Sequence, residues 1–208
     1  LLSILFFGTP IVVVLAVLRR PLIQFLFERG EFTPRDTEFV AWGLLFYAAA
    51  LIALAILEVV ARAFYAVGDT KTPVIAGMAQ LPIMIVFSSL FGYVLFPLWD
   101  LLPLGGLALG YTISNFLEIG ILLWLLRRRM GGLEGWYLAD ASWRVMLAAG
   151  CMLLLTVLTL STLRDSLAIV QIIVVGLVGG GGYLISCYLL KLRELEQIVA
   201  YGRRRLRL

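Results

Sequence analysis

The sequence predicts an all-α integral membrane protein, built as a bundle of six transmembrane helices. Of its 208 residues 62% are hydrophobic and 14% are charged, whereas soluble proteins carry about 25% charged residues. The mean hydropathy is +1.02. Apolar residues gather in runs of about 20, the length that a helix needs to cross a bilayer, without the period of two that barrel strands show. These observations exclude a disordered or fibrous chain and nearly every soluble globular domain.

The predicted spans follow one another with short connections, so neighbours in sequence are expected to lie antiparallel. After the first span, Pro21–Gly30 indicates a short amphipathic segment at the membrane interface. The approximate bounds of the six spans are Leu2–Leu18, Phe39–Phe64, Val74–Leu98, Leu104–Leu126, Val145–Leu163 and Leu167–Leu190.

Two of these spans have marked starts. Thr33 is placed to cap a helix whose first residue is Pro34, and Asp36 lies where a capping box needs an acceptor. Thr72 and Pro73 repeat the arrangement before the third span, which predicts a helix that begins at Pro73 with Thr72 as its cap.

The sequence contains no signature of an enzyme, a cofactor site or a metal site. It has no histidine, and Cys151 and Cys187 lie within apolar stretches, where we expect small apolar fillers rather than ligands or a disulfide. The basic residues lie at the edges of spans and not on one soluble face, which argues against nucleic-acid binding. The chain also begins at Leu1 inside an apolar run, without a Met or a signal peptide, so we expect it to be part of a longer protein.

The distribution of basic residues predicts the orientation in the membrane. Twelve of them fall on the side that includes the C-terminal tail, and five fall on the other side. The positive-inside rule therefore predicts a cytoplasmic C-terminus. The minority set consists of Arg19, Arg20, Arg29, Arg35 and Arg164.

The ionisable residues inside the spans are the candidates for function. Glu58 and Arg62 are four residues apart in the favourable order for a helical ion pair. They form either a mutually neutralised pair, with Arg62 reaching the interface, or a gate contact or head-group ligand that lines a cavity. Glu118 lies midway along the fourth span with Asn115 three residues before it, next to a row of small residues that allows close helix approach. Both residues are candidates for lining a cavity, and Glu118 has either a packing role or a role in transport or cation coupling.

Five glycines between Gly176 and Gly182 lie in the middle of the sixth span. A phosphate-binding loop would need a preceding strand and a Lys-Ser/Thr pair, which this run lacks. We expect close helix packing or a local bend there.

Two stretches on either side of the second span resemble a known family. Residues 62–73 read RAFYAVGDTKTP, and residues 26–37 read LFERGEFTPRDT. They are similar to the motifs R-A-F-Y-A-x-G-D-T-[KR]-T-P and L-F-x-R-G-x-F-T-x-x-D-T of the MurJ (MviN) family of lipid II flippases. That family belongs to the multidrug/oligosaccharidyl-lipid/polysaccharide exporter superfamily. The first stretch predicts a tight cytoplasmic connection with a structural role or a role in gating, and its residues of interest are Tyr65, Gly68, Asp69, Lys71, Thr72 and Pro73.

The resemblance implies a fragment of a fourteen-helix flippase, which has two six-helix lobes followed by two extra helices. Residues 1–130 would be the remainder of the second lobe, 131–190 the two extra helices, and 191–208 a basic cytoplasmic tail. It also implies a multi-pass protein of the bacterial inner membrane that moves the peptidoglycan precursor lipid II by alternating access. Its partners would be the lipid-linked glycan, membrane lipids and the N-terminal lobe of the same protein, where the family's main substrate-binding cations lie.

Other functions remain open at this point. A related exporter of another lipid-linked oligosaccharide or of drugs would share the fold and the mechanism. A non-transporting scaffold for wall synthesis would share the fold alone. A membrane-embedded enzyme would need a polar catalytic cluster, which the sequence does not contain.

Overall fold

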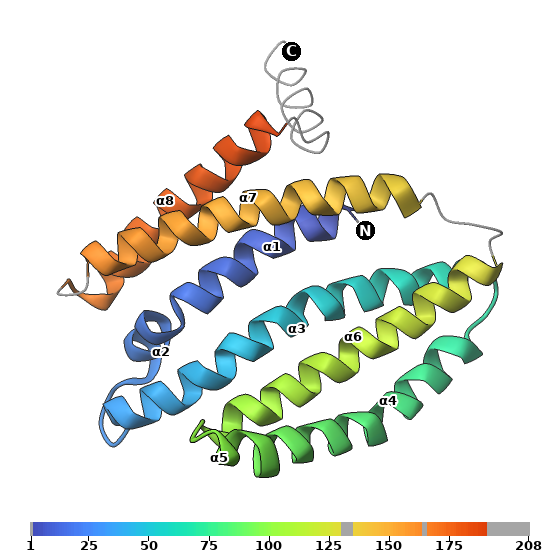
Figure 1. Cartoon of the computed structure of the whole chain (residues 1–208), viewed down its shortest axis with the longest axis horizontal. Coiled ribbons are helices and arrows are strands. Elements are labelled where there is room, and N and C mark those ends of the chain that lie inside the picture. The colour runs from blue at the N-terminus through green and yellow to red at the C-terminus, as the bar shows by residue number, and fades with distance from the viewer. Residues whose placement is uncertain (1, 130–134, 164–165, 191–208) are drawn as a thin grey trace. The chain divides into compact units, whose positions relative to one another are not determined.

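The computed structural model describes residues 2–129, 135–163 and 166–190, and for residues 135–141 it describes the backbone alone. All regular structure in these residues is helical, as the sequence predicts (Figure 1). Within them, five helical stretches are long and apolar enough to cross a membrane, or six if α1 (Leu2–Val17) and α2 (Arg19–Phe27) together count as one span. The predicted basic tail 191–208 lies outside the described residues.

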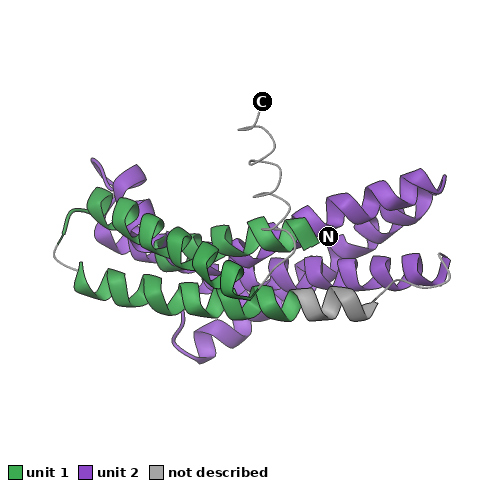
Figure 2. Cartoon of the chain, turned by 90° about the horizontal axis from the view of Figure 1, so that it is seen from above, with its two compact units in different colours: residues 1–18, 134–208 green, residues 19–133 purple. Residues whose placement is uncertain are grey.

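The helices form two compact units, which Figure 2 shows in different colours. Unit 1 contains α1, α7 (Gly135–Thr162) and α8 (Ala168–Leu189). Within this unit α1 packs against α7 and α8. The division of the chain into 1–130, 131–190 and 191–208 stays a prediction. Unit 2 contains α2, α3 (Pro34–Ala66), α4 (Lys71–Ser89), the π-helix η1 (Leu90–Leu95), α5 (Phe96–Leu98) and α6 (Pro103–Arg129).

Helix α6 is the centre of unit 2, because it packs against both α3 and α4. Small residues allow its backbone to approach the end of α4 and η1. A Cβ atom added to Gly110 would lie 2.3 Å from the backbone nitrogen of Ser88. On the side of α3, the Thr112 hydroxyl donates to the carbonyl oxygen of Phe46 at 2.9 Å. The predicted row of small residues on α6, to which Gly110 belongs, is therefore part of a helix–helix contact.

The start of α3 confirms the predicted capping box. The backbone N–H of Thr33 donates to the Asp36 carboxylate at 2.8 Å, and the backbone N–H of Asp36 donates to the Thr33 hydroxyl at 3.4 Å. Pro34 is the first helical residue, where its missing N–H removes no helical hydrogen bond.

The third span is one helical stretch with two irregularities. Pro82 lies inside α4 and donates no backbone hydrogen bond, and the helix then widens into the π-helix η1 before α5. The three elements together form the candidate span Lys71–Leu98. The stretch ends in a turn where Asp100 has a φ of 53°.

Unit 1 has a closed apolar core. Phe6 of α1 is 2% exposed, and Met152 of α7 and Cys187 of α8 are fully buried beside it. Cys151, by contrast, is exposed on α7. Helix α8 continues without a break through its glycine cluster. Of those glycines, Gly179 and Gly182 are the ones whose added Cβ would meet a side chain of α7, in each case at 2.4 Å.

Candidate functional site: two cavities that share Glu118

The connection between α3 and α4 is tight because a glycine reverses the chain. Gly68 has a φ of 77°, in the left-handed region that other residues rarely adopt. Its N–H donates to the carbonyl of Tyr65 at 3.0 Å, and the N–H of Asp69 donates to the carbonyl of Phe64 at 3.0 Å. These two bonds are the Schellman arrangement that ends a helix, so the glycine of the motif has a clear structural role.

Asp69 starts the next helix. Its Oδ1 accepts the backbone N–H groups of Lys71 at 3.1 Å and Thr72 at 3.0 Å, and its Oδ2 accepts the Thr72 hydroxyl at 2.5 Å. Helix α4 therefore begins at Lys71, and the prediction that Thr72 caps a helix starting at Pro73 is wrong. The carboxylate satisfies the free N–H groups better than a hydroxyl does, because it also complements the positive end of the helix dipole.

Asp69 also joins this connection to the end of α6. The Arg129 guanidinium lies 2.6 Å from Asp69 Oδ2, and the Asp69 side chain is 11% exposed. The hydrogen bond from the Thr72 hydroxyl, with smaller contributions from backbone N–H groups and from Arg129, holds the pKa of the Asp69 carboxyl below its usual value. The motif thus ties the ends of α3, α4 and α6 together.

Glu58 and Arg62 form the predicted ion pair on α3. Oε1 of Glu58 lies 2.9 Å from Nη2 and 3.1 Å from Nε of Arg62. Both side chains are largely exposed, at 65% and 73%. The structure therefore places this pair at the surface of unit 2 and not in its interior.

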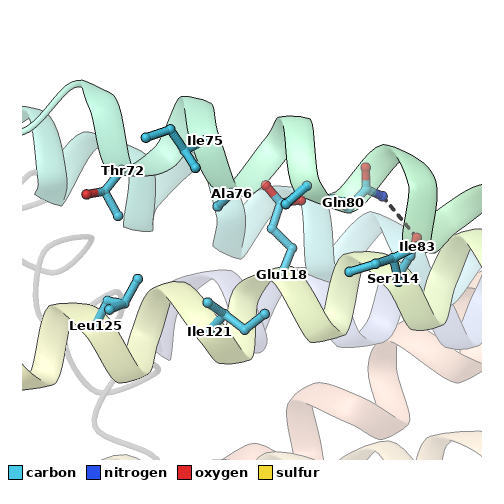
Figure 3. A pocket seen from close by; sticks show the side chains of 10 residues that line it. Thr72, Ile75, Ala76, Gln80, Ile83, Ser114, Glu118, Ile121 and Leu125 are labelled. Atoms are coloured by element: carbon cyan, nitrogen blue, oxygen red, sulfur yellow. Dashed lines mark hydrogen bonds between the residues drawn. The ribbon is translucent and has the colours of Figure 1, made fainter.

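A first cavity of about 250 Å³ lies between α4 and α6 (Figure 3). We call it the Glu118 cavity. Its polar lining consists of Thr72, Gln80, Ser114 and Glu118. Its apolar lining consists of Ile75, Ala76, Ala79, Ile83, Ile121 and Leu125. Such a lining, apolar with a few polar groups, is typical of small-molecule sites.

Glu118 reaches from α6 toward α4, as Figure 3 shows. The residue is 7% exposed, and a Cβ added to Gly77 of α4 would lie 3.5 Å from its Oε1. Among the described residues no hydrogen bond or ion pair reaches its carboxylate. A buried carboxylate without a partner is costly, which makes Glu118 a candidate for binding a ligand.

A second cavity of about 370 Å³ lies on the other side of the Glu118 carboxylate, against α3. Glu58, Tyr65 and Pro73 line it together with Glu118. The two cavities therefore share one buried acid. The second one brings together four of the residues that the sequence singles out.

Other predicted residues lie elsewhere. Asn115 is 3% exposed and donates to the carbonyl of Tyr111 on its own helix at 2.8 Å, and it lines neither cavity. Arg62 is also absent from the lining of both cavities. Sequence reasoning missed Gln80, whose amide donates to the Ser114 hydroxyl at 2.9 Å. A lone amide within the apolar run Val74–Leu98 was the signal that could have found it.

The described residues offer little to a metal ion. They contain no group of three or more His, Cys, Asp or Glu side chains that could hold one. The Glu118 cavity therefore offers binding by one carboxylate, one amide and two hydroxyls between apolar walls, and the second cavity adds the Glu58 carboxylate and the Tyr65 hydroxyl.

Comparison with known proteins identifies the family. The family model described as lipid II flippase MurJ matches residues 1–176. The chain belongs to the MurJ family. It is 36% identical over 121 residues to the Probable lipid II flippase MurJ of Vibrio cholerae, covering 56% of this chain and 21% of that protein. It is 32% identical over 119 residues to the Lipid II flippase MurJ of Thermosipho africanus, covering 57% of this chain and 24% of that protein.

A solved structure gives the same assignment. The chain matches "Lipid II flippase MurJ, inward closed conformation" with a TM-score of 0.72 and 28% identity, over 92% of this chain and 37% of that one. The chain thus spans about a quarter of the MurJ relatives it matches in sequence, and somewhat more of the solved one. It is a multi-pass membrane protein with the fold of part of a MurJ flippase.

Proposed function

We propose that this chain is the C-terminal part of a lipid II flippase, which moves the lipid-linked peptidoglycan precursor across the bacterial inner membrane by alternating access. The single observation that supports this most is the family match, which extends over residues 1–176 and includes both motifs next to the second span. The names of the relatives in Vibrio cholerae and Thermosipho africanus support the same substrate. The activity is that of a transporter and not of an enzyme.

Within such a flippase the chain would supply two parts. Residues 1–130, with α1, α3, α4 and α6, would be the remainder of the second transport lobe, and α7 and α8 would be the pair of helices that follows it. The two cavities at Glu118 lie between the lobe helices, where alternating access requires polar groups sheltered from lipid. The lobe that precedes this part would complete the transport pathway.

We propose a cytoplasmic C-terminus. The excess of basic residues, twelve against five, supports a cytoplasmic position for the α3–α4 connection and the end of α6. The ion pair between Asp69 and Arg129 would then fasten three helix ends together at the cytoplasmic face.

Depletion of the whole protein that contains this chain tests the function. In bacteria depleted of it, lipid II should accumulate on the cytoplasmic leaflet, and re-expression of the whole protein should restore its exposure on the outer leaflet. The measurement is the fraction of radiolabelled lipid II that an impermeant enzyme added outside spheroplasts can modify. Unchanged outer-leaflet lipid II during depletion would contradict the assignment, and loss of a different lipid-linked glycan would favour the related-exporter alternative.

A further inference from the structure

The Glu118 cavity contains a carboxyl group that no basic side chain in the described part of unit 2 is paired with. Arg62 is engaged by Glu58, and Arg129 is engaged by Asp69. Neither interaction involves Glu118, whose carboxylate is without a partner among the described residues. The cavity therefore presents an unpaired carboxyl group to whatever enters it.

The other polar groups of the cavity add acceptors. Gln80 is 9% exposed and uses its Nε2 to donate to Ser114, which leaves its Oε1 as an acceptor. The Ser114 hydroxyl donates its hydrogen bond to the carbonyl of Tyr111 at 2.8 Å, so its oxygen is left as an acceptor. The matching ligand is therefore a cation with several hydrogen-bond donors.

The lining of the cavity favours an organic cation over calcium or magnesium. Calcium and magnesium take about six or more oxygen ligands in proteins, and this cavity offers one carboxylate with a few neutral oxygens. Six aliphatic side chains make up the rest of the lining. An aliphatic lining favours a ligand with an apolar part, and a cavity volume of about 250 Å³ means that this part is small.

We propose that the Glu118 cavity binds a compact hydrophobic ammonium ion, with the ammonium group paired to Glu118 and the apolar body between α4 and α6. The Gln80 amide oxygen would accept a second N–H of the ligand. The inference rests on the geometry of this cavity and does not depend on the proposed transport function.

Binding of a charged probe and a neutral one of the same shape tests the proposal. The probes are benzylammonium and benzyl alcohol, measured by equilibrium dialysis against the purified chain in lipid nanodiscs, with empty nanodiscs subtracted to remove partition into lipid. The chain should bind benzylammonium saturably and benzyl alcohol more weakly. Equal binding of the two probes, or no saturable binding of benzylammonium, would overturn the proposal.

Variants identify the residue and the place. Glu118→Gln should weaken benzylammonium binding by about tenfold or more and leave benzyl alcohol binding unchanged, because the loss of a charge-assisted hydrogen bond affects the cation alone. Ala76→Leu, which fills the cavity, should abolish binding of both probes. Glu38→Gln removes an acid outside the cavity and should change neither, since Glu38 pairs with Arg20. Circular dichroism and elution volume establish that each variant is folded.

Two results would reject the site as drawn. Binding of benzylammonium to folded Glu118→Gln with the affinity of the unmodified chain would show that the carboxylate takes no part. Displacement of benzylammonium by sodium chloride, but not by N-methylglucamine chloride, would identify an inorganic-cation site instead.

Discussion

The two units use their buried polar groups in different ways. In unit 1 the Tyr183 hydroxyl donates to the carbonyl of Phe6 at 2.8 Å, and the buried Thr156 hydroxyl donates to the carbonyl of Met152 at 2.8 Å. In unit 2 Gln80 and Ser114 bond to each other, but Glu118 stays without a partner between two cavities. Polar groups in unit 1 thus stabilise the backbone, whereas unit 2 keeps one acid available. The candidate binding groups therefore lie in unit 2.

In unit 1 the Tyr183 hydroxyl replaces a helical hydrogen bond that a proline removes. The carbonyl of Phe6 would normally accept the N–H of residue 10, but that residue is Pro10, which has no N–H. The Tyr183 hydroxyl of α8 fills the vacant position. Unit 2 also has a proline inside a helix, Pro82 in α4, and the next residue along the chain lines the Glu118 cavity.

The largest expected loss of stability is at the close contact between α6 and the end of α4 in unit 2. Gly110→Ala should lower the free energy of unfolding by about 3 kcal/mol, because the new methyl group would lie 2.3 Å from the backbone of Ser88 and force α6 away from α4. Reversible unfolding in mixed detergent micelles measures the change. Gly120→Ala is the matched control on the same helix, since an added Cβ there meets nothing within 4 Å. Equal effects of the two substitutions would show that α6 and α4 are not in close contact.

The second effect concerns unit 1. Tyr183→Phe should cost about 1 kcal/mol of unfolding free energy, since it leaves the Phe6 carbonyl without a donor in an apolar core. Tyr188→Phe, at an exposed position of α8, should cost little.

A double-mutant cycle distinguishes this explanation from simple packing. Pro10→Ala restores a backbone N–H opposite the Phe6 carbonyl and should recover most of the loss in the Tyr183→Phe background. Additive effects of the two substitutions would mean that the proline and the tyrosine are not coupled.

A smaller and pH-dependent effect is expected at the connection between α3 and α4. The pKa of Asp69 is lower in the folded protein than in the unfolded chain, because Thr72 and Arg129 bond to the ionised form. The stabilisation is therefore present above the unfolded pKa of about 4 and is lost as pH falls through the folded pKa. Asp69→Asn should lower stability at pH 7 and flatten the acid limb of the stability profile. An unchanged acid limb would show that ionisation of Asp69 does not stabilise the folded protein.

The sequence predicted the helices well because their causes are local. Apolar runs and the Thr33 capping box placed α3 within a few residues, and the glycine of the motif gave its end. The sequence did not predict that Asp69 would replace Thr72 as the capping group, because residue type alone does not show which acceptor reaches the N–H groups.

The arrangement of helices was harder to predict, since it depends on contacts between distant residues. Nothing in the apolar pattern of α1 distinguishes a partner in α3 from partners in α7 and α8. The pair of Asp69 and Arg129 joins residues of different helices, so neither spacing nor periodicity indicates it. The sequence singled out Glu118 by its depth in the span, whereas the cavities around it follow from how α3, α4 and α6 pack.

The smallest expected effect completes the comparison between the units. Glu118→Gln replaces a carboxyl group that has no partner to lose, so the free energy of unfolding should change by less than about 0.5 kcal/mol or rise. Tyr183→Phe, which does remove a bond, should cost more in the same assay. A large loss of stability in Glu118→Gln would mean that the carboxylate has a structural partner.

The orientation of Glu118 is the central claim, and a nitroxide side chain tests it most directly. Cys151 and Cys187 are replaced by Ala, and a single Cys at position 118 or 117 is spin-labelled in lipid bilayers. The measurement is the collision rate of the label with oxygen, which concentrates in lipid. Position 118 should show a much lower rate than position 117, because Glu118 is 7% exposed while Leu117 is 43% exposed. An equal or higher rate at position 118 would place the acid on the lipid-facing side of α6 and would contradict the account.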